Sequence, residues 1–103
     1  DVLVNQCNMS AVDFMKLVSG NPAKLYGMYP KKGTLAVGSD GDITIVDKHI
    51  EHVLSKESAH TKADYIPYEG ISVTGMVRDV ILRGHHVVQD GSLTESYLGE
   101  CIP

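Results

Sequence analysis

The chain has 103 residues, of which 43% are hydrophobic and 21% charged, and its formal net charge is -4. This composition is typical of one small soluble globular domain and excludes a disordered or fibrous chain. The acidic balance disfavours nucleic acid as a partner, because phosphate binding needs clustered Lys and Arg, and the only basic cluster is Lys31-Lys32. No apolar run approaches the roughly 20 residues that span a bilayer. The first residues also lack the pattern of a signal peptide.

Two cysteines, Cys7 and Cys101, lie near opposite ends of the chain and form no CxxC motif. We interpret them as two free thiols of a cytoplasmic protein, since the cytosol keeps thiols reduced. A single disulfide that joins the two ends is the alternative. The chain begins at Asp1 and not at Met, which suggests that an upstream segment is missing.

The first predicted element is helical. Ser10 and Asp13 fit the [ST]xx[DE] capping signature, and apolar side chains follow at helical spacing. Ser19-Gly20 predicts an end, Asn21-Pro22 predicts a new first turn, and Gly27 predicts a left-handed stop. The sequence therefore predicts a helix, a kink and one more turn over residues 10–27.

After residue 30 the hydrophobic period changes from helical to alternating, which predicts about five short strands. They are expected at residues 34–37, 42–47, 71–74, 79–83 and 85–89. The last two form a hairpin, with Asp90-Gly91 as its closing turn. Residues 48–64 are interpreted as a polar loop, with an irregular strand as the alternative. Pro67 excludes a central strand from residues 65–70, and residues 92–103 are expected to form a tail.

The predicted fold class is an α+β fragment, with helices first and a partial β-layer after them. Strands this short need partners, and exposed edges make an incomplete sheet when the segment is isolated.

Three groups of residues were weighed as metal or catalytic sites. His49 and His52 could share one face of a helix, but the segment lacks helix-forming context and a third ligand, so we expect solvated loop histidines. His85 and His86 are adjacent on a strand, so their side chains point to opposite faces and cannot bind one ion. A triad of residues 58, 60 and 64 would require Ser, His and Asp to converge on one short loop, and a polar loop contains these residues by chance.

Glycines and acidic residues of the predicted turns were weighed as a phosphate or acid–base site. No GxGxxG or Walker pattern accompanies them, so we expect these glycines to serve turns that need positive φ. Asp40 and Asp42 are expected to be turn formers that bond their own backbone. The glycines are Gly33, Gly38, Gly41 and Gly70. The sequence thus predicts no catalytic, cofactor-binding or metal-binding residue in this chain.

The order of these elements is informative. Residues 21–27 (NPAKLYG), 29–40 (YPKKGTLAVGSD) and 42–47 (DITIVD) resemble the closing region of the amidohydrolase superfamily. Residues 64–70 (DYIPYEG) and 73–75 (VTG) resemble its dihydropyrimidinase and hydantoinase branch, and residues 80–91 are similar to the terminal hairpin of that branch. The resemblance covers roughly residues 10–99. Gly41, where the family more often has Ala, is a mild departure.

The resemblance implies a parent with a TIM-like (β/α)8 barrel and a β-sandwich. Residues 1–30 would be the end of the catalytic barrel, residues 31–91 the C-terminal part of the sandwich, and residues 92–103 a tail used in subunit contacts. The parent would hold two zinc ions bridged by a carboxylated lysine. A hydroxide activated by these metals would attack and open the cyclic amide. The family's ligands, which include an HxH motif and an aspartate, lie upstream; no HxH occurs here, and Asp13 lacks the context of the metal aspartate.

The resemblance therefore implies a scaffolding segment whose partners are the upstream barrel and sandwich of its own chain, in a homo-oligomer. Two alternatives stay open. One is a non-catalytic dihydropyrimidinase-like scaffold protein, and the other is an independent small β-rich binding module. The presence or absence of HxH and the metal-binding lysine upstream would distinguish the fragment of a hydrolase from the non-catalytic scaffold protein.

Overall fold

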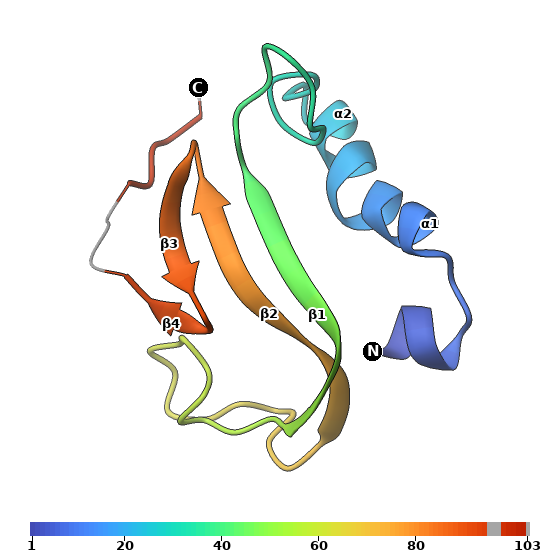
Figure 1. Cartoon of the computed structure of the whole chain (residues 1–103), viewed down its shortest axis with the longest axis vertical. Helices are drawn as coiled ribbons and strands as arrows, with labels where there is room; N and C mark the ends of the chain where they lie inside the picture. Colours follow the sequence, from blue (N-terminus) through green and yellow to red (C-terminus); the bar gives the residue numbers. More distant parts are fainter. Residues whose placement is uncertain (95–97, 103) are drawn as a thin grey trace.

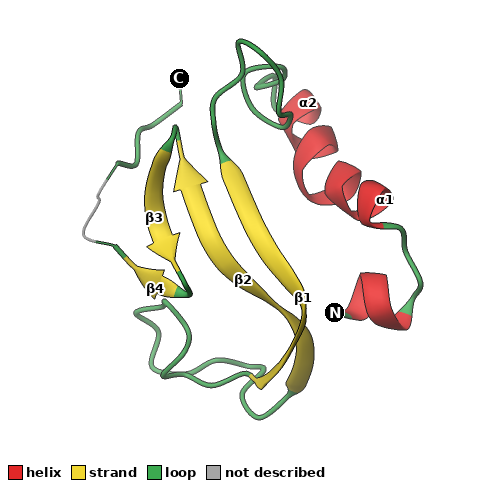
Figure 2. Cartoon of the chain, in the orientation of Figure 1, coloured by secondary structure: helices red, strands yellow, loops and turns green. Residues whose placement is uncertain are grey.

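The computed structural model describes residues 1–94 and 98–102, which form an α+β arrangement of a helical segment followed by a four-stranded antiparallel sheet (Figure 1). The helical segment lies on the β1 side of the sheet (Figure 2). The elements are η1 (Val2–Gln6), α1 (Ala11–Met15), η2 (Lys16–Gly20), α2 (Asn21–Leu25), β1 (Ile43–Val53), β2 (Ser72–Leu82), β3 (His85–Gln89) and β4 (Ser92–Leu93). The predicted fold class is confirmed, with four strands in place of about five.

The helical segment starts as its sequence predicts. The Ser10 hydroxyl oxygen accepts the Asp13 N–H at 3.1 Å and donates to the Asp13 carboxylate at 2.8 Å. Gly27, at φ 70°, ends the segment, and the Met28 N–H donates to the Ala23 carbonyl at 2.8 Å. This 6→1 bond is the one expected of a left-handed glycine stop.

The predicted break at residues 19–21 is wrong. Gly20 and Asn21 both have right-handed helical angles, and the π-helical turn η2 carries the chain from α1 directly into α2. A proline in a helix clashes with the carbonyl four residues earlier, and a wider π turn gives that ring more room. α2 therefore begins at Asn21 with Pro22 in its first turn, as predicted, but it follows η2 without a break.

The connector, residues 26–42, contains no strand, so the strand predicted at residues 34–37 is wrong. Gly33 and Gly38 turn the chain at the two ends of this stretch, with φ of 83° and 93°, and no strand of the described sheet pairs with it. The apolar side chains that suggested a strand point outward instead: Leu35 is 69% exposed and Val37 is fully exposed.

The sheet has the order β1-β2-β3-β4. β1 pairs with β2 from Ile43↔Ile81 to Val53↔Ser72. β1 therefore continues into residues 48–53, with an irregularity between Asp47 and Glu51, so the strand alternative holds for this part of 48–64. His49 and His52, expected as loop histidines, lie on a strand. The strands predicted at residues 71–74 and 79–83 are two ends of the single strand β2, with two shifts in its register against β1 between them.

The predicted hairpin of residues 79–89 is confirmed, but its turn was misplaced. Arg83 and Gly84 make the β2–β3 turn, with φ of 47° and 82°. Asp90 and Gly91, at 47° and 76°, close a second hairpin, β3–β4, whose last strand falls in the segment predicted to be tail. Two successive positive φ values are the signature of tight hairpin turns, so both dipeptides are suited to this role.

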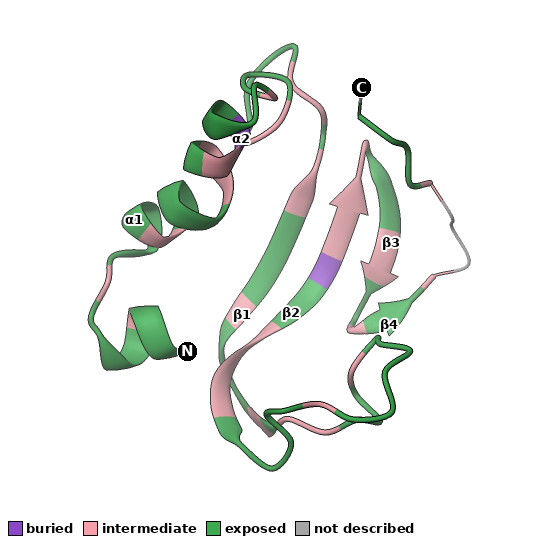
Figure 3. Ribbon diagram, turned by 180° about the vertical axis from the view of Figure 1, so that it is seen from behind, coloured by how far each residue is buried: buried purple, intermediate pink, exposed green. Residues whose placement is uncertain are grey.

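Few side chains are buried. Among the described residues only Ala23, at 3% exposure, and Asp79, at 6%, are buried (Figure 3). The accessible surface is 8017 Å², whereas a compact monomer of this mass has about 5,700 Å². The radius of gyration is 15.1 Å, against about 13 Å for a compact domain of this length. The described residues therefore do not enclose a core of their own, and no helix among them is long and apolar enough to cross a membrane.

Candidate functional site

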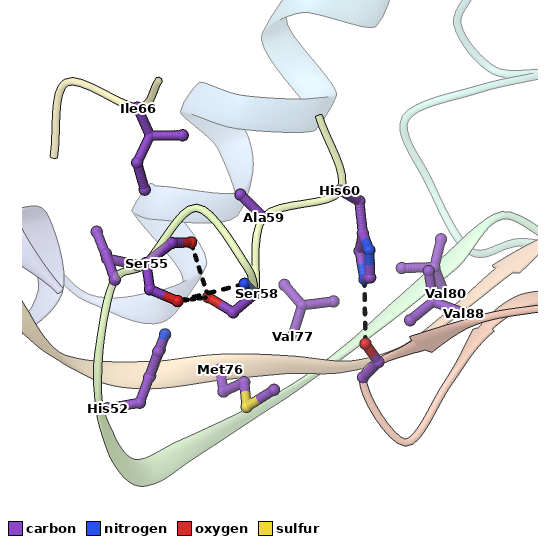
Figure 4. A pocket seen from close by; sticks show the side chains of 12 residues that line it. His52, Ser55, Ser58, Ala59, His60, Ile66, Met76, Val77, Val80 and Val88 are labelled. Atoms are coloured by element: carbon purple, nitrogen blue, oxygen red, sulfur yellow. Dashed lines mark hydrogen bonds between the residues drawn. The ribbon is translucent and has the colours of Figure 1, made fainter. Parts of the chain in front are cut away.

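One hollow, of about 320 Å³, lies between the segment that follows β1 and the face of the sheet (Figure 4). Its lining is mainly apolar and includes Ile66, Met76 and Val80. The His52 Nδ1 atom is buried there without a hydrogen-bond partner among the described residues. A cavity lined in this way can accept an apolar side chain, and it lacks the converging polar groups that orient a substrate.

Apart from His52, the polar residues of this hollow form hydrogen bonds with other groups. The Ser58 hydroxyl donates to the Ser55 carbonyl at 3.0 Å, and the His60 Nε2 atom is 3.1 Å from the Gly91 carbonyl oxygen. His60 thus ties the segment after β1 to the β3–β4 turn, and the recorded contacts of Ser58 and His60 do not join them in a triad with Asp64.

The histidines and cysteines do not fit a metal site in this chain. Among the described residues no three His, Cys, Asp or Glu side chains lie close enough together to bind one ion. His49 and His52 are three positions apart on β1, an odd spacing that favours opposite faces of a strand. Cys7 and Cys101 are both free and exposed, which agrees with the free-thiol prediction. The described residues therefore do not fit the two-zinc site that the resemblance implies for the parent enzyme.

Asp13, which the sequence analysis compared with the metal aspartate of the family, has a structural role. Its carboxylate accepts from the Ser10 hydroxyl and pairs with Lys16 at 3.1 Å. The Ser10 hydrogen bond, followed by the Lys16 contact, lowers the pKa of Asp13. All three groups belong to the first turns of the helical segment, so this arrangement stabilises the helix start.

A cluster of charged residues joins the connector to the sheet. The Lys32 ammonium pairs with Asp40 at 2.8 Å and with Asp42, whose other oxygen accepts the Arg83 backbone N–H at 2.9 Å. The Arg83 guanidinium donates to the Leu98 carbonyl and lies 3.3 Å from the Glu100 carboxylate.

Sequence reasoning missed this cluster, because it treated Asp40 and Asp42 as residues that bond their own turn. The alternation of Asp40 and Asp42 with one small residue between them was the available signal, since it allows both carboxylates to reach one cation. Burial raises the pKa of Asp42, but the hydrogen bonds and charges of Lys32 and Arg83 outweigh it and hold that pKa below its usual value. The Asp40 and Asp42 carboxylates raise the pKa of Lys32.

The second buried residue, Asp79, is also structural. Its carboxylate lies 2.6 Å from Arg78 Nε and accepts the Asp90 N–H at 3.3 Å. The Arg78 hydrogen bond is the largest cause of the lowered pKa of Asp79. Asp79 thereby connects β2 with the β3–β4 turn.

Many large apolar side chains of the described residues are exposed. Leu25 is 80% exposed and Tyr26 is 74% exposed at the end of the helical segment. Others that are at least half exposed in this segment are Val12, Met15, Leu17 and Val18. Extensive apolar exposure of this kind marks a surface that another structure covers.

Comparison with known proteins agrees with the sequence resemblance. The profile of the Amidohydrolase family matches residues 2–87, which is most of the chain. The chain belongs to the amidohydrolase family.

The most similar relatives of this amidohydrolase chain include hydantoinases. It is 44% identical to D-hydantoinase of Ralstonia pickettii over 97 residues, which are 94% of this chain and 20% of the relative. It is 49% identical to D-hydantoinase of Geobacillus stearothermophilus over 77 residues, or 75% of this chain and 16% of the relative. The predicted resemblance to the hydantoinase and dihydropyrimidinase branch is thereby confirmed.

Solved structures give the same result. The amidohydrolase chain superposes on D-hydantoinase from a Bacillus species, AR9, with a TM-score of 0.85 and 46% identity, covering 89% of this chain and 20% of that one. For dihydropyrimidinase from Brevibacillus agri the TM-score is 0.84 and the identity 41%, with 88% and 20% covered. The chain thus spans about a fifth of the length of the relatives it matches.

Proposed function

We propose that this amidohydrolase chain is the C-terminal portion of a metal-dependent hydrolase that opens cyclic amides of the dihydropyrimidine or hydantoin type. The bond cleaved would be a C–N bond other than a peptide bond. The observation that carries the proposal is the match itself: nearly the whole chain is 44% identical to a D-hydantoinase, of which it covers only 20%. The two zinc ions and the carboxylated lysine implied by the resemblance would belong to the upstream part.

In this proposal the segment is a scaffold. Residues 1–30 would close the barrel with their helices, residues 31–91 would complete the sandwich, and residues 92–103 would contact other subunits of a homo-oligomer. The accessible surface supports this role, because it exceeds that of a compact monomer by about 2,300 Å². An excess of this size is comparable to the area of a large permanent interface.

The edge of the sheet supports the same role. β1, the 11-residue strand Ile43–Val53, pairs with β2 on one side and has no other strand partner in the described sheet. Long unpaired edges are usually covered or charged in native proteins, because they recruit further strands. We expect a strand of the upstream sandwich to occupy this edge.

The proposal is tested by reading the coding sequence upstream of Asp1 and assaying the isolated chain. We expect the upstream sequence to encode an HxH motif and the metal-binding lysine. We also expect the isolated chain to show no hydrolysis of hydantoin or dihydrouracil with added zinc. Metal-dependent turnover by the isolated chain would contradict a scaffolding role. An upstream sequence without these ligands would favour the non-catalytic relative instead.

A further inference from the structure

The connector decides how the helical segment is placed relative to the sheet. Direct packing between the helices and the strands is sparse in the described residues. One side-chain contact joins them near the N-terminus, where the Asn5 amide donates to the Thr74 carbonyl at 3.3 Å. The position of α2 relative to β1 therefore depends on how rigid residues 26–42 are.

Hydrogen bonds hold the start of the connector to α2. Met28 and Tyr29 both donate their N–H groups to the Ala23 carbonyl, at 2.8 and 3.0 Å. At the other end, the Asp40 N–H donates to the Lys31 carbonyl at 2.9 Å, which brings the start of β1 back to the first half of the connector. The connector is therefore a folded element and not an extended linker.

Asp42 joins this folded connector to the β2–β3 turn, which lies beside the start of β1. One oxygen of its carboxylate binds Lys32, and the other accepts the N–H of Arg83 in the β2–β3 turn. The side chains of Lys32 and Asp42 are only 17% and 32% exposed, so solvent screens the pair less than it screens a surface salt bridge. We name Lys32, Asp40, Asp42 and Arg83 together the Asp42 bridge.

Arg83 extends the Asp42 bridge to the end of the chain. Its φ of 47° is uncommon for a residue other than glycine and belongs to the tight β2–β3 turn. Here the backbone N–H faces Asp42, and the guanidinium contacts the Leu98 carbonyl and Glu100. The same residue thus contacts the connector and residues 98–102.

We propose that the Asp42 bridge fixes the orientation of the helical segment relative to the sheet and, through Arg83, holds residues 98–102, so that these three parts move as one body. The proposal does not depend on the hydrolase assignment, because it concerns contacts inside this chain. Residues 32, 40, 42 and 83 are positioning residues in this scheme.

Distance measurements between two spin labels test the orientation. The labels are placed at Leu25→Cys on α2 and His85→Cys on β3, both exposed, in the full chain with Cys7→Ser and Cys101→Ser. The unmodified bridge should give one narrow distance distribution. Lys32→Met and Asp42→Ala should each broaden it about twofold, because the angle between the two parts is then free to vary.

Lys31→Met is the matched control, because it removes the same charge from the neighbouring residue, for which no ion pair is recorded among the described residues. It should leave the distribution unchanged. An unchanged distribution in both Lys32→Met and Asp42→Ala would overturn the proposal. Equal broadening in Lys31→Met would overturn it as well, since net charge alone would then explain the effect.

Hydrogen exchange resolved to single amides tests the transmission through Asp42. Asp42→Asn keeps an oxygen that can accept the Arg83 N–H but loses the charge that binds Lys32. It therefore separates the ion pair with Lys32 from the hydrogen bond with Arg83. We expect Lys32→Met to speed exchange of the Arg83 N–H about tenfold although Lys32 does not touch it, and Asp42→Asn to do the same. Unchanged exchange at Arg83 in both folded variants, as judged by circular dichroism, would overturn the coupling.

Discussion

At Gly33 the connector packs closely against Ala23 of α2, and substitution there tests this packing. A Cβ atom at Gly33 would lie 2.4 Å from the Ala23 Cβ and 3.2 Å from the Ser19 carbonyl oxygen. The φ of Gly33 is 83°, so alanine would also be strained. The left-handed conformation costs about 1–2 kcal/mol, and overpacking adds about 1–3 kcal/mol. Gly33→Ala should therefore destabilise the connector by about 2–5 kcal/mol.

Gly38→Ala is the matched control for this prediction. Its φ of 93° is just as unfavourable for alanine, but no atom lies within 4 Å of the added Cβ. It should therefore cost only the conformational part, about 1–2 kcal/mol. The difference between the two variants isolates the clash with Ala23.

Hydrogen exchange of the Met28 and Tyr29 amides measures this difference, because both donate to Ala23 and report local opening without requiring a two-state melt. We expect exchange in Gly33→Ala to be faster than in Gly38→Ala by about tenfold or more. Equal exchange in the two variants would refute the close packing of Gly33 on Ala23.

Three further predictions follow from the described contacts. Ser10→Ala should cost about 1 kcal/mol of helix stability by removing the N-cap, whereas Lys16→Ala, which breaks an exposed ion pair, should cost less than about 0.5 kcal/mol. Urea unfolding followed by circular dichroism compares the two variants. Equal losses of stability would contradict the capping role of Ser10. The pKa of Asp79 is lowered in the folded state, so the stability that this carboxylate contributes is present above its unfolded pKa and is lost as pH falls through the folded pKa. A titration of the Asp79 carboxyl by ¹³C NMR should have its midpoint below 3.8. A midpoint at or above 3.8 would contradict the Arg78 contact. The isolated chain should self-associate through its apolar helical surface, which sedimentation velocity would show as a mass that rises with concentration; a monomer with a highly cooperative melt would be the contrary result.

Local signals in the sequence predicted the parts of the fold that depend on neighbouring residues. The Ser10 cap and the Gly27 stop were predicted correctly, because each involves hydrogen bonds across only a few residues. The hairpin of residues 79–89 was also predicted, since its alternation and its turn residues are contiguous. Its turn was misplaced because Arg83-Gly84 and Asp90-Gly91 are both suited to positive φ, and only the pairing with β2 distinguishes them.

The errors occurred where the structure depends on residues far apart in sequence. The stretch 34–37 alternates like a strand, but Gly33 turns the backbone toward Ala23 and the following apolar residues have no strand to pair with. His49 and His52 were assigned to a loop because of their polarity. The pairing of Glu51 with Thr74 and of His52 with Val73 extends β1 through this stretch.

The charged cluster was missed for the same reason. Lys32 and Asp42 are ten positions apart, and Arg83 is a further 41 from Asp42, so no local pattern could bring them together. The family resemblance was carried by short contiguous motifs such as NPAKLYG and was therefore visible in the sequence.

A chimera tests the central claim most directly. In the D-hydantoinase of Ralstonia pickettii, the region that aligns with this chain is replaced by it. Hydantoin hydrolysis by this chimera is compared with that of the same enzyme truncated before this region. If the chain is the scaffolding end of such a hydrolase, the chimera should hydrolyse hydantoin within about tenfold of the parent rate, and the truncated enzyme should be inactive. A correctly folded but inactive chimera, or a fully active truncated enzyme, would contradict the account.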